Sequence, residues 1–103
     1  MGDSRDVQHE GPAQRFVIAR GGEEAMLRYR RNGSTIDLSE TFVPPSLRGQ
    51  GLAEQLCRAA FEYAKAERLT VIPSCSYISR AYLKRHPEYE PLTRSGGSGS
   101  VSR

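Results

Sequence analysis

The chain has 103 residues, of which 37% are hydrophobic and 26% charged, which fits one globular domain and leaves too small a core for two. Fifteen lysines and arginines against twelve acids give a net charge of +3, with the acids interleaved, unlike the concentrated positive charge of most nucleic-acid binders. No apolar run approaches the roughly 20 residues of a membrane helix, and the polar first residues lack the apolar segment of a signal peptide. We therefore expect a cytoplasmic protein whose two cysteines are reduced.

The two ends of the chain differ in composition from the middle. Residues 1–12 show no apolar periodicity and predict a flexible leader, and residues 93–103 predict a flexible tail rich in glycine and serine. The remaining residues, 13–92, predict a single folded domain.

The first half of this domain predicts three antiparallel strands. Gln14 to Ala19 and Glu24 to Arg30 alternate between apolar and polar residues, and a short glycine-containing connection makes them a hairpin. Asn32-Gly33 predicts a tight turn into a third strand, Thr35 to Val43. Ile36, Leu38 and Phe42 share one face of that strand, and so does Glu40 unless a bulge shifts the register.

The second half predicts a helix, a strand and a second helix. Gln50 to Arg68 carries one apolar stripe at helical spacing, Leu69 to Ile72 is a short buried strand, and Tyr77 to His86 is a helix ended by Pro87. The stripe consists of Ala53, Leu56, Cys57, Ala60, Phe61 and Ala64. The expected fold is α/β with a mixed sheet: an antiparallel three-strand meander, a helix, a parallel strand reached by a right-handed crossover, and a helix.

The segment Val43-Pro-Pro-Ser-Leu-Arg-Gly-Gln-Gly-Leu-Ala53 lies between a strand and the start of a helix. Unpaired amides at a helix start carry partial positive charge and can bind a phosphate, and glycines let a ligand approach the backbone. The segment lacks the lysine of a P-loop, and Glu54 stands where the dinucleotide fingerprint has its third glycine. Neither of those nucleotide motifs is therefore present.

Arg48-Gly-Gln-Gly-Leu-Ala53 resembles the acyl-CoA signature of the GNAT superfamily of N-acetyltransferases, Gln/Arg-x-x-Gly-x-Gly/Ala. Ile72-Pro-Ser-Cys-Ser-Tyr-Ile78 is similar to a segment of a subgroup of small, single-domain members with about 100 residues. The resemblance covers roughly residues 13–92. It implies the GNAT fold and acetyl-CoA or coenzyme A as cosubstrate.

The resemblance also implies which residues bind CoA. The pyrophosphate is expected on the backbone of Arg48, Gly49, Gln50, Gly51, Leu52 and Ala53. The pantetheine arm is expected beside Thr41, Phe42, Val43 and Ser74, where the third and fourth strands separate. Arg80, with Lys84 and Arg85, could reach the 3′-phosphate, although a solvated helix face explains these three residues as well.

The candidate catalytic residues are Cys75, Glu40 and Tyr77. Cys75 follows the fourth strand and could protonate the leaving thiolate, carry the acyl group or form a mixed disulfide with CoA; the alternative is a small packed residue. Glu40 could be the base, although small members of the family often have histidine there. Tyr77, or Tyr82, could be the acid, and core packing would explain either one. Cys57, in the helix stripe, is expected in the core.

The resemblance thus implies an acetyl-CoA-dependent N-acetyltransferase that transfers an acetyl group directly to an amine. Only Arg20 to Glu23 separate the first two strands, where full-length members have two helices, so the acceptor side should be open and suit a protein or peptide amine. The alternative is a CoA-binding module with little or no catalysis. Less favoured are a nucleic-acid binder and a hydrolase using Cys75 and His86. No metal is expected, because two histidines and two scattered cysteines do not make a zinc site.

Overall fold

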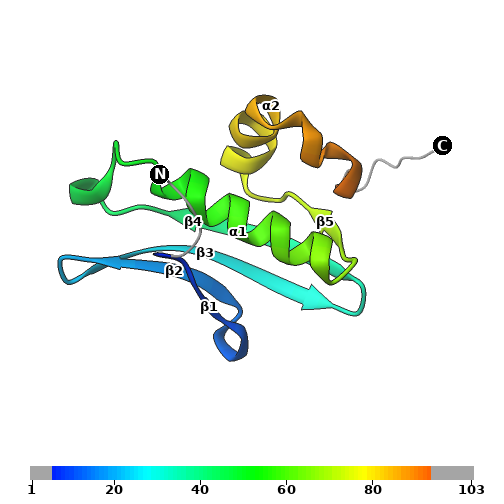
Figure 1. Cartoon of the computed structure of the whole chain (residues 1–103), viewed down its shortest axis with the longest axis horizontal. Helices are drawn as coiled ribbons and strands as arrows, with labels where there is room; N and C mark the ends of the chain where they lie inside the picture. Colours follow the sequence, from blue (N-terminus) through cyan, green and yellow to red (C-terminus); the bar gives the residue numbers. More distant parts are fainter. Residues whose placement is uncertain (1–5, 94–103) are drawn as a thin grey trace.

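The computed structural model describes residues 6–93, which form a five-stranded mixed sheet with the long helix α1 on one face (Figure 1). The strand order follows the chain, with the first four strands antiparallel and the last pair parallel. The strands are β1 (Gln8–Glu10), β2 (Arg15–Arg20), β3 (Glu23–Asn32), β4 (Thr35–Phe42) and β5 (Thr70–Ile72). The helices are α1 (Leu52–Ala66) and α2 (Leu83–Arg85), with a π-helical turn η4 (Ile78–Tyr82) before α2 and the 3-10 segments η2 (Gly11–Ala13), η3 (Pro45–Leu47) and η5 (Pro87–Leu92).

The predicted order of a meander, a helix, a parallel strand and a helix is confirmed by the structure. Both hairpin turns contain glycines in the left-handed region, with φ of 58° and 82° at Gly21 and Gly22 and 63° at Gly33. Residues with a side chain rarely adopt these angles, so the glycines set the lengths of the turns and the register of β2, β3 and β4.

The ends of the folded region extend beyond the prediction. Gln8–Glu10 were expected in a flexible leader, but they form β1 and pair with β2, placing His9 opposite Phe16. Thr93, expected in the tail, makes an isolated bridge to Val71. The rest of the predicted leader up to residue 5 and of the tail from residue 94 lies outside the described residues.

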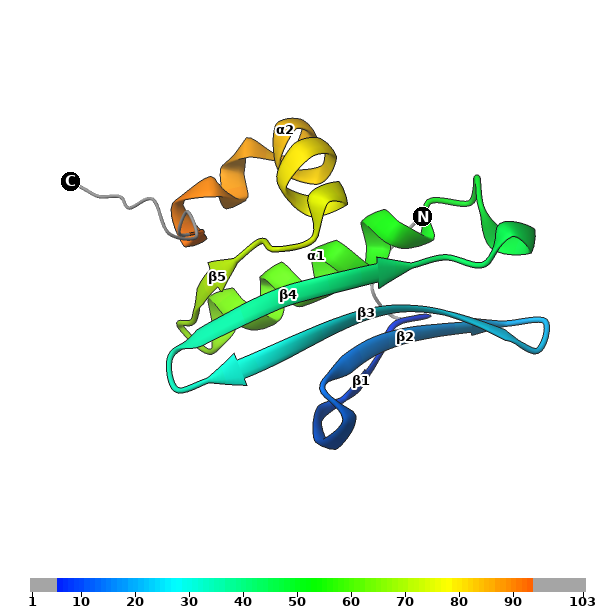
Figure 2. The ribbon, with the colours of Figure 1, turned by 180° about the vertical axis from the view of Figure 1, so that it is seen from behind.

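The core lies between the sheet and α1. The buried stripe of α1 packs against Ile18, Leu27 and Leu38 of the sheet, and the C-terminal helical segments pack beside α1. The buried residues of α1 are Leu52, Leu56, Cys57, Ala60, Phe61 and Ala64. Figure 2 shows the other face of the sheet with none of the described helices in front of it. No described helix is long and apolar enough to span a membrane.

Candidate functional site

The connection from β4 to α1 exposes backbone amides at the start of α1. Gly49 and Gly51 have φ of 83° and 75°, and Gly51 is the residue that caps the helix. No side chain caps this end, and the first helical hydrogen bond runs from the Gln55 N–H to the Gly51 carbonyl oxygen. The amides of Leu52 and Ala53 therefore have no partner within the helix, and they are available to an anion.

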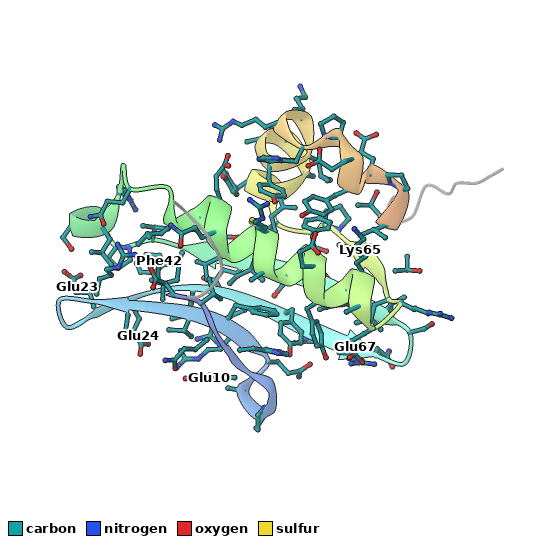
Figure 3. The ribbon with its side chains drawn as sticks, in the orientation of Figure 1. Glu10, Glu23, Glu24, Phe42, Lys65 and Glu67 are labelled. Atoms are coloured by element: carbon teal, nitrogen blue, oxygen red, sulfur yellow. The ribbon has the colours of Figure 1, made fainter. Side chains whose placement is uncertain are left out.

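A cavity of about 560 Å³ opens over these amides. Every residue that the sequence predicted to bind CoA in the β4 end and the loop lines it, except Gln50. The lining residues are Thr41, Phe42, Val43, Leu47, Arg48, Gly49, Gly51, Leu52, Ala53, Glu54, Tyr77 and Arg85. Figure 3 shows Phe42 at this end of the sheet, far from Lys65 and Glu67 at the other end of α1.

Arg48 holds the two sides of the loop together. Its Nε–H donates a hydrogen bond of 3.0 Å to the carbonyl oxygen of Val43, which follows β4. This bond fixes the guanidinium at the rim of the cavity, where it adds positive charge to that of the helix start. A phosphate bound here would contact both the Arg48 guanidinium and the amides at the start of α1.

β4 and β5 separate where the cavity begins. Their pairing ends at Asp37 and Ile72, and one further bond joins the Cys75 N–H to the Leu38 carbonyl oxygen at 3.0 Å. Beyond Leu38, the edge of β4 that faces β5 is open to a ligand. An extended arm with amide groups could pair there as an added strand would.

A β-bulge decides which side chains of β4 face the helix side. The register shifts between Arg28 and Tyr29 of β3, so that Tyr29 pairs with Leu38 and Arg28 pairs with Glu40. Ser39 is the extra residue, and after it the faces alternate in the opposite sense. The prediction that Leu38, Glu40 and Phe42 share one face of the strand is therefore wrong, because Glu40 and Phe42 lie on the face opposite to Leu38.

Thr41, which the sequence singled out only as a backbone partner, faces the cavity. Its Oγ1 accepts a hydrogen bond from the Cys75 thiol at 3.5 Å, and it also lines the cavity. Glu40 lies on the opposite face, exposed, with its carboxylate 3.8 Å from Arg28 Nε. Because of the bulge, the side chain that faces the cavity next to Cys75 is the Thr41 hydroxyl and not the Glu40 carboxylate, which had been the candidate base.

The position of Glu40 gives a direct prediction. Because its carboxylate points away from the cavity, we expect Glu40→Gln to leave acetyl-CoA binding and any acetyl transfer within about twofold of the wild-type values, and to change the unfolding free energy by less than about 0.5 kcal/mol. Titration calorimetry and chemical denaturation measure the two quantities. A loss of tenfold or more in either binding or rate would show that Glu40 does act at the site.

Glu54, which lies in the first turn of α1, joins the cavity to the C-terminal helices. Arg85 Nη1 forms an ion pair with one of its carboxylate oxygens, and His86 Nε2 lies 3.1 Å from the other. Burial alone would raise the pKa of Glu54, but hydrogen bonds from Arg85 and His86 outweigh it and hold the pKa below its ordinary value. Glu54 is therefore ionised at neutral pH, and much of its charge is compensated.

Of the remaining candidate residues, some line the cavity and others lie in the core or outside the cavity. Tyr77 lines the cavity, and burial raises the pKa of its phenol, which keeps it protonated. Tyr82 is 1% exposed and stacked on Phe61, which supports the core role. Ser74, Arg80 and Lys84 do not line this cavity.

Cys57 and His86 both make contacts that explain them as structural residues. Cys57 is fully buried, and burial raises the pKa of its thiol, so it remains protonated and packed in the core as expected. His86 contacts Glu54 and Tyr82, and no hydrogen bond joins it to Cys75, its partner in the less favoured hydrolase alternative, among the described residues. Among residues 6–93 no group of three metal-binding side chains comes together.

Two residues of the cavity, Leu47 and Glu54, had no functional role predicted from the sequence. Leu47 is buried in η3 and forms the apolar floor of the loop. Glu54 could have been suspected, because it stands in the first turn of the helix at the position where a glycine would leave the phosphate site open.

Comparisons with known proteins bear on the family of the chain. Residues 15–92 match the model of the GCN5-related N-acetyl-transferase family. Protein NATD1 of Xenopus tropicalis is 34% identical over 91 residues, covering 85% of this chain and 83% of the relative, and Protein NATD1 of Homo sapiens is 34% identical over 91 residues, covering 85% and 80%.

A solved structure shares the fold. The solution NMR structure of a GCN5-like protein from Staphylococcus aureus superposes with a TM-score of 0.67 at 24% identity, covering 88% of this chain and 91% of that one. The fold, the match over residues 15–92 and the relatives lead to one conclusion. The chain belongs to the GCN5-related N-acetyltransferase family.

Proposed function

We propose that the protein is an acetyl-CoA-dependent N-acetyltransferase that transfers the acetyl group directly to an amine of a protein or peptide. The observation that carries this proposal is the single cavity that joins the free amides at the start of α1 to the open edge of β4. The first feature suits a pyrophosphate and the second suits an amide-bearing arm, and the family pairs these two binding elements with acetyl transfer.

The residues of the cavity have distinct tasks in this proposal. The backbone from Gly49 to Ala53, with Arg48, holds the pyrophosphate, and the edge of β4 from Thr41 to Val43 orients the pantetheine arm. These contacts place the thioester at the inner end of the cavity, next to the Thr41 hydroxyl. The thioester then loses most of its translational and rotational freedom when CoA binds, so this entropy loss does not add to the barrier of the chemical step.

The chemistry at the inner end requires one proton to leave and one to arrive. The amine nitrogen attacks the thioester carbonyl carbon, a C–N bond forms and the C–S bond breaks. The nitrogen releases its proton to solvent water, and the protein acid that protonates the thiolate recovers a proton from solvent. We assign the protonation of the departing thiolate to the Cys75 thiol, which does not itself line the cavity but donates a hydrogen bond to Thr41, and Tyr77, which does line it, is the second group that can do so. The negative charge that develops on the carbonyl oxygen needs hydrogen-bond donors, and the backbone amides at the open edge of β4 can supply them.

The acceptor side is open. The β2–β3 turn consists of Gly21 and Gly22, so no helix stands between these two strands. The described contacts beside the turn come from the β4–α1 connection, from Ser46 to Glu23 and from Arg20 to Gln50. A small metabolite would find few side chains to enclose it there, whereas a peptide can bring its own contact surface. This supports a protein or peptide amine as the acceptor.

A second candidate function is CoA binding without turnover. One observation favours it: Glu40 faces away from the cavity, and the carboxylate that does line it, Glu54, is held by Arg85 and His86. No general base is therefore free among the described lining residues. Mass spectrometry of candidate peptides after incubation with acetyl-CoA separates the two functions, because a binding module leaves every peptide unmodified while an acetyltransferase adds one acetyl group to an amine.

Substitutions at Cys75 and Thr41 test the acid. We expect Cys75→Ala to lower kcat about a hundredfold or more, the usual contribution of a general acid, and Thr41→Val to lower it about three- to tenfold through loss of one hydrogen bond. Steady-state rates with a reactive peptide provide the measurement. Glu40→Gln is the matched control, since it is one residue from Thr41 on the opposite face. Full activity of Cys75→Ala would remove Cys75 from the mechanism and leave Tyr77 as the acid.

A further inference from the structure

The face of the sheet opposite α1, called the open face below, has none of the described helices in front of it (Figure 2). A second cavity, of about 600 Å³, lies on the other side of the sheet, between the first half of α1 and residues 82–89, and no strand residue lines it. The first cavity differs, because it also reaches the open face, at the end of β4.

Thr41 and Phe42 show how the first cavity reaches that face. They are consecutive residues of β4, so their side chains point to opposite faces of the sheet, yet both line the cavity. The edge of β4 beyond Leu38 is not paired with β5, so the cavity can pass around this edge. An acceptor that lies on the open face therefore has a route past Phe42 to the thioester.

Phe42 begins an apolar strip on the open face. Its side chain is the one large apolar side chain among residues 6–93 that is exposed. The strand register places Met26 beside Phe42 and Val17 beside Met26, so the strip crosses β4, β3 and β2. A half-exposed ring offers a surface on which the aliphatic part of a long side chain can pack.

The charged side chains of the strands on the open face do not balance. Arg28 Nε lies 3.8 Å from the Glu40 carboxylate, and Arg30 pairs in register with Asp37. Arg15 lies 2.6 Å from the Glu10 carboxylate and 3.6 Å from that of Glu24, so two carboxylates share one guanidinium. The residue list is Glu10, Glu24, Asp37 and Glu40 against Arg15, Arg28 and Arg30. One negative charge is left over, and Glu24, the more distant partner of Arg15, carries it.

Glu24 lies beside the apolar strip. It precedes Met26 by two residues on the same face of β3, which makes it a diagonal neighbour of Phe42, at about 7–8 Å for such pairs. Glu23 lies at the same end of the sheet (Figure 3), accepts a hydrogen bond from the Ser46 hydroxyl and forms no ion pair with another described residue. The strip is therefore bordered by two carboxylates without a cation of their own.

We propose that the open face at the end of β4 docks a positively charged peptide segment and that the acceptor is a lysine of that segment. The aliphatic part of the lysine packs on Phe42, and the flanking positive residues meet Glu23 and Glu24. This inference rests on the proposed function, because it takes the thioester in the first cavity as the acyl donor and the transfer as the step given above. It specifies a lysine in a basic segment in place of any peptide amine.

Bound CoA strengthens the charge complementarity. Its phosphates meet the Arg48 guanidinium, the cation at the rim of the first cavity, and bring further negative charge to this end of the sheet. A basic segment is thus favoured most when the acyl donor is already in place.

The test uses two peptides with a blocked N-terminus and one central lysine, flanked by arginines in one and by aspartates in the other. Steady-state rates at saturating acetyl-CoA are compared for wild type, Glu24→Lys, Glu67→Lys and Phe42→Ala. Glu67 is the matched control, because its carboxylate, like that of Glu24, lies 3.6 Å from an arginine, and the side chains are 47% and 46% exposed. It lies at the other end of α1 from Phe42 (Figure 3).

We expect wild type to acetylate the arginine-flanked peptide with a kcat/KM about tenfold or more above that of the aspartate-flanked peptide, through KM, and added salt should shrink this preference. Glu24→Lys should lower the preference about threefold or more, whereas Glu67→Lys should keep it within about twofold. Phe42→Ala should raise KM for both peptides about three- to tenfold, because the apolar contact is lost for either one.

The other outcomes contradict the inference separately from the proposed function. Equal kcat/KM for the two peptides in wild type, or equal effects of Glu24→Lys and Glu67→Lys, would overturn the docking surface and leave acetyl transfer intact. A dimer in sedimentation that dissociates in Phe42→Ala would mean that a second copy of the chain covers the face, and would overturn it too.

If neither peptide is acetylated, fluorescence anisotropy of the labelled peptides on the CoA-saturated protein decides. Tighter binding of the arginine-flanked peptide, weakened by Glu24→Lys and not by Glu67→Lys, would support the docking surface while the proposed transfer fails. Binding of neither peptide would overturn the docking surface.

Discussion

Gly51→Val should reduce CoA affinity by about a hundredfold, the loss of roughly two charge-assisted hydrogen bonds from backbone amides. Gly51 has φ of 75° at the helix cap, a conformation that a β-branched residue adopts only with strain. The backbone must then shift, which moves the amides of Leu52 and Ala53. A Cβ at Gly51 would meet nothing within 4 Å, so the side chain itself projects into open space at the mouth of the cavity.

Gly33→Val is the matched control for this substitution. Gly33 has φ of 63° and also has nothing within 4 Å of a Cβ, but it lies in the β3–β4 turn outside both cavities. Both variants should lose a similar amount of stability, about 1–2 kcal/mol from the left-handed conformation. Calorimetric titration with CoA then separates backbone strain from binding. Equal CoA affinity in the two variants would contradict a phosphate site on the Gly51 loop.

Phe61→Ala should lower the unfolding free energy by about 3–5 kcal/mol, the usual cost of removing a buried aromatic ring. The Phe61 ring is fully buried, and its centroid lies 5.6 Å from that of Tyr82 and 4.9 Å from that of Tyr89. These stacks join α1 to the C-terminal segments that wall the second cavity. In a domain this small, with a total stability of about 5–15 kcal/mol, the loss should lower Tm by more than about 10 °C.

Phe42→Ala provides the comparison for Phe61. The Phe42 side chain is 43% exposed on the open face of the sheet, so its removal leaves no cavity in the core. We expect a change within about 0.5 kcal/mol. Urea denaturation of both variants gives the two values. Equal destabilisation would mean that the two rings are equally buried, contrary to the packing described above.

The loop at the start of α1 could be predicted because its determinants are local. Gly49 and Gly51 specify unusual backbone angles, the proline pair ends β4, and the apolar stripe of α1 begins immediately afterwards. Each of these features acts within a few residues in the chain. These features predicted the loop and the start of the helix, whereas the residues expected to bind CoA and the separation of β4 from β5 came from the resemblance to the GNAT superfamily.

The faces of β4 could not be predicted beyond Leu38. Alternation alone places Glu40 and Phe42 on the buried face, and only the pairing with β3 inserts the bulge at Ser39. The Ser39 hydroxyl donates to the Arg28 carbonyl oxygen at 3.2 Å, which is a contact between strands and leaves no trace in a single-strand pattern. Thr41 was consequently missed as the side chain that meets Cys75.

β1 depends on contacts far along the chain in the same way. The His9 ring stacks on Phe16 with centroids 4.2 Å apart and meets the edge of Tyr63, 4.5 Å away, while its Nε2 bonds the Tyr29 hydroxyl. A three-residue strand has no periodicity to detect, and its stability comes from these aromatic contacts. The second cavity was missed for the same reason, since its walls come from α1 and from residues 82–89.

The most direct measurement is a titration of the isotope-labelled protein with acetyl-CoA, followed through its backbone amide resonances. Binding at the first cavity predicts saturable shifts of the amides of Gly49, Gly51, Leu52 and Ala53 and of the β4 end from Thr41 to Val43. The amide of Gly33, in the distant β3–β4 turn, should stay in place. No saturable shift at millimolar acetyl-CoA, or shifts confined to residues outside this cavity, would contradict the proposal that the cavity is a CoA site.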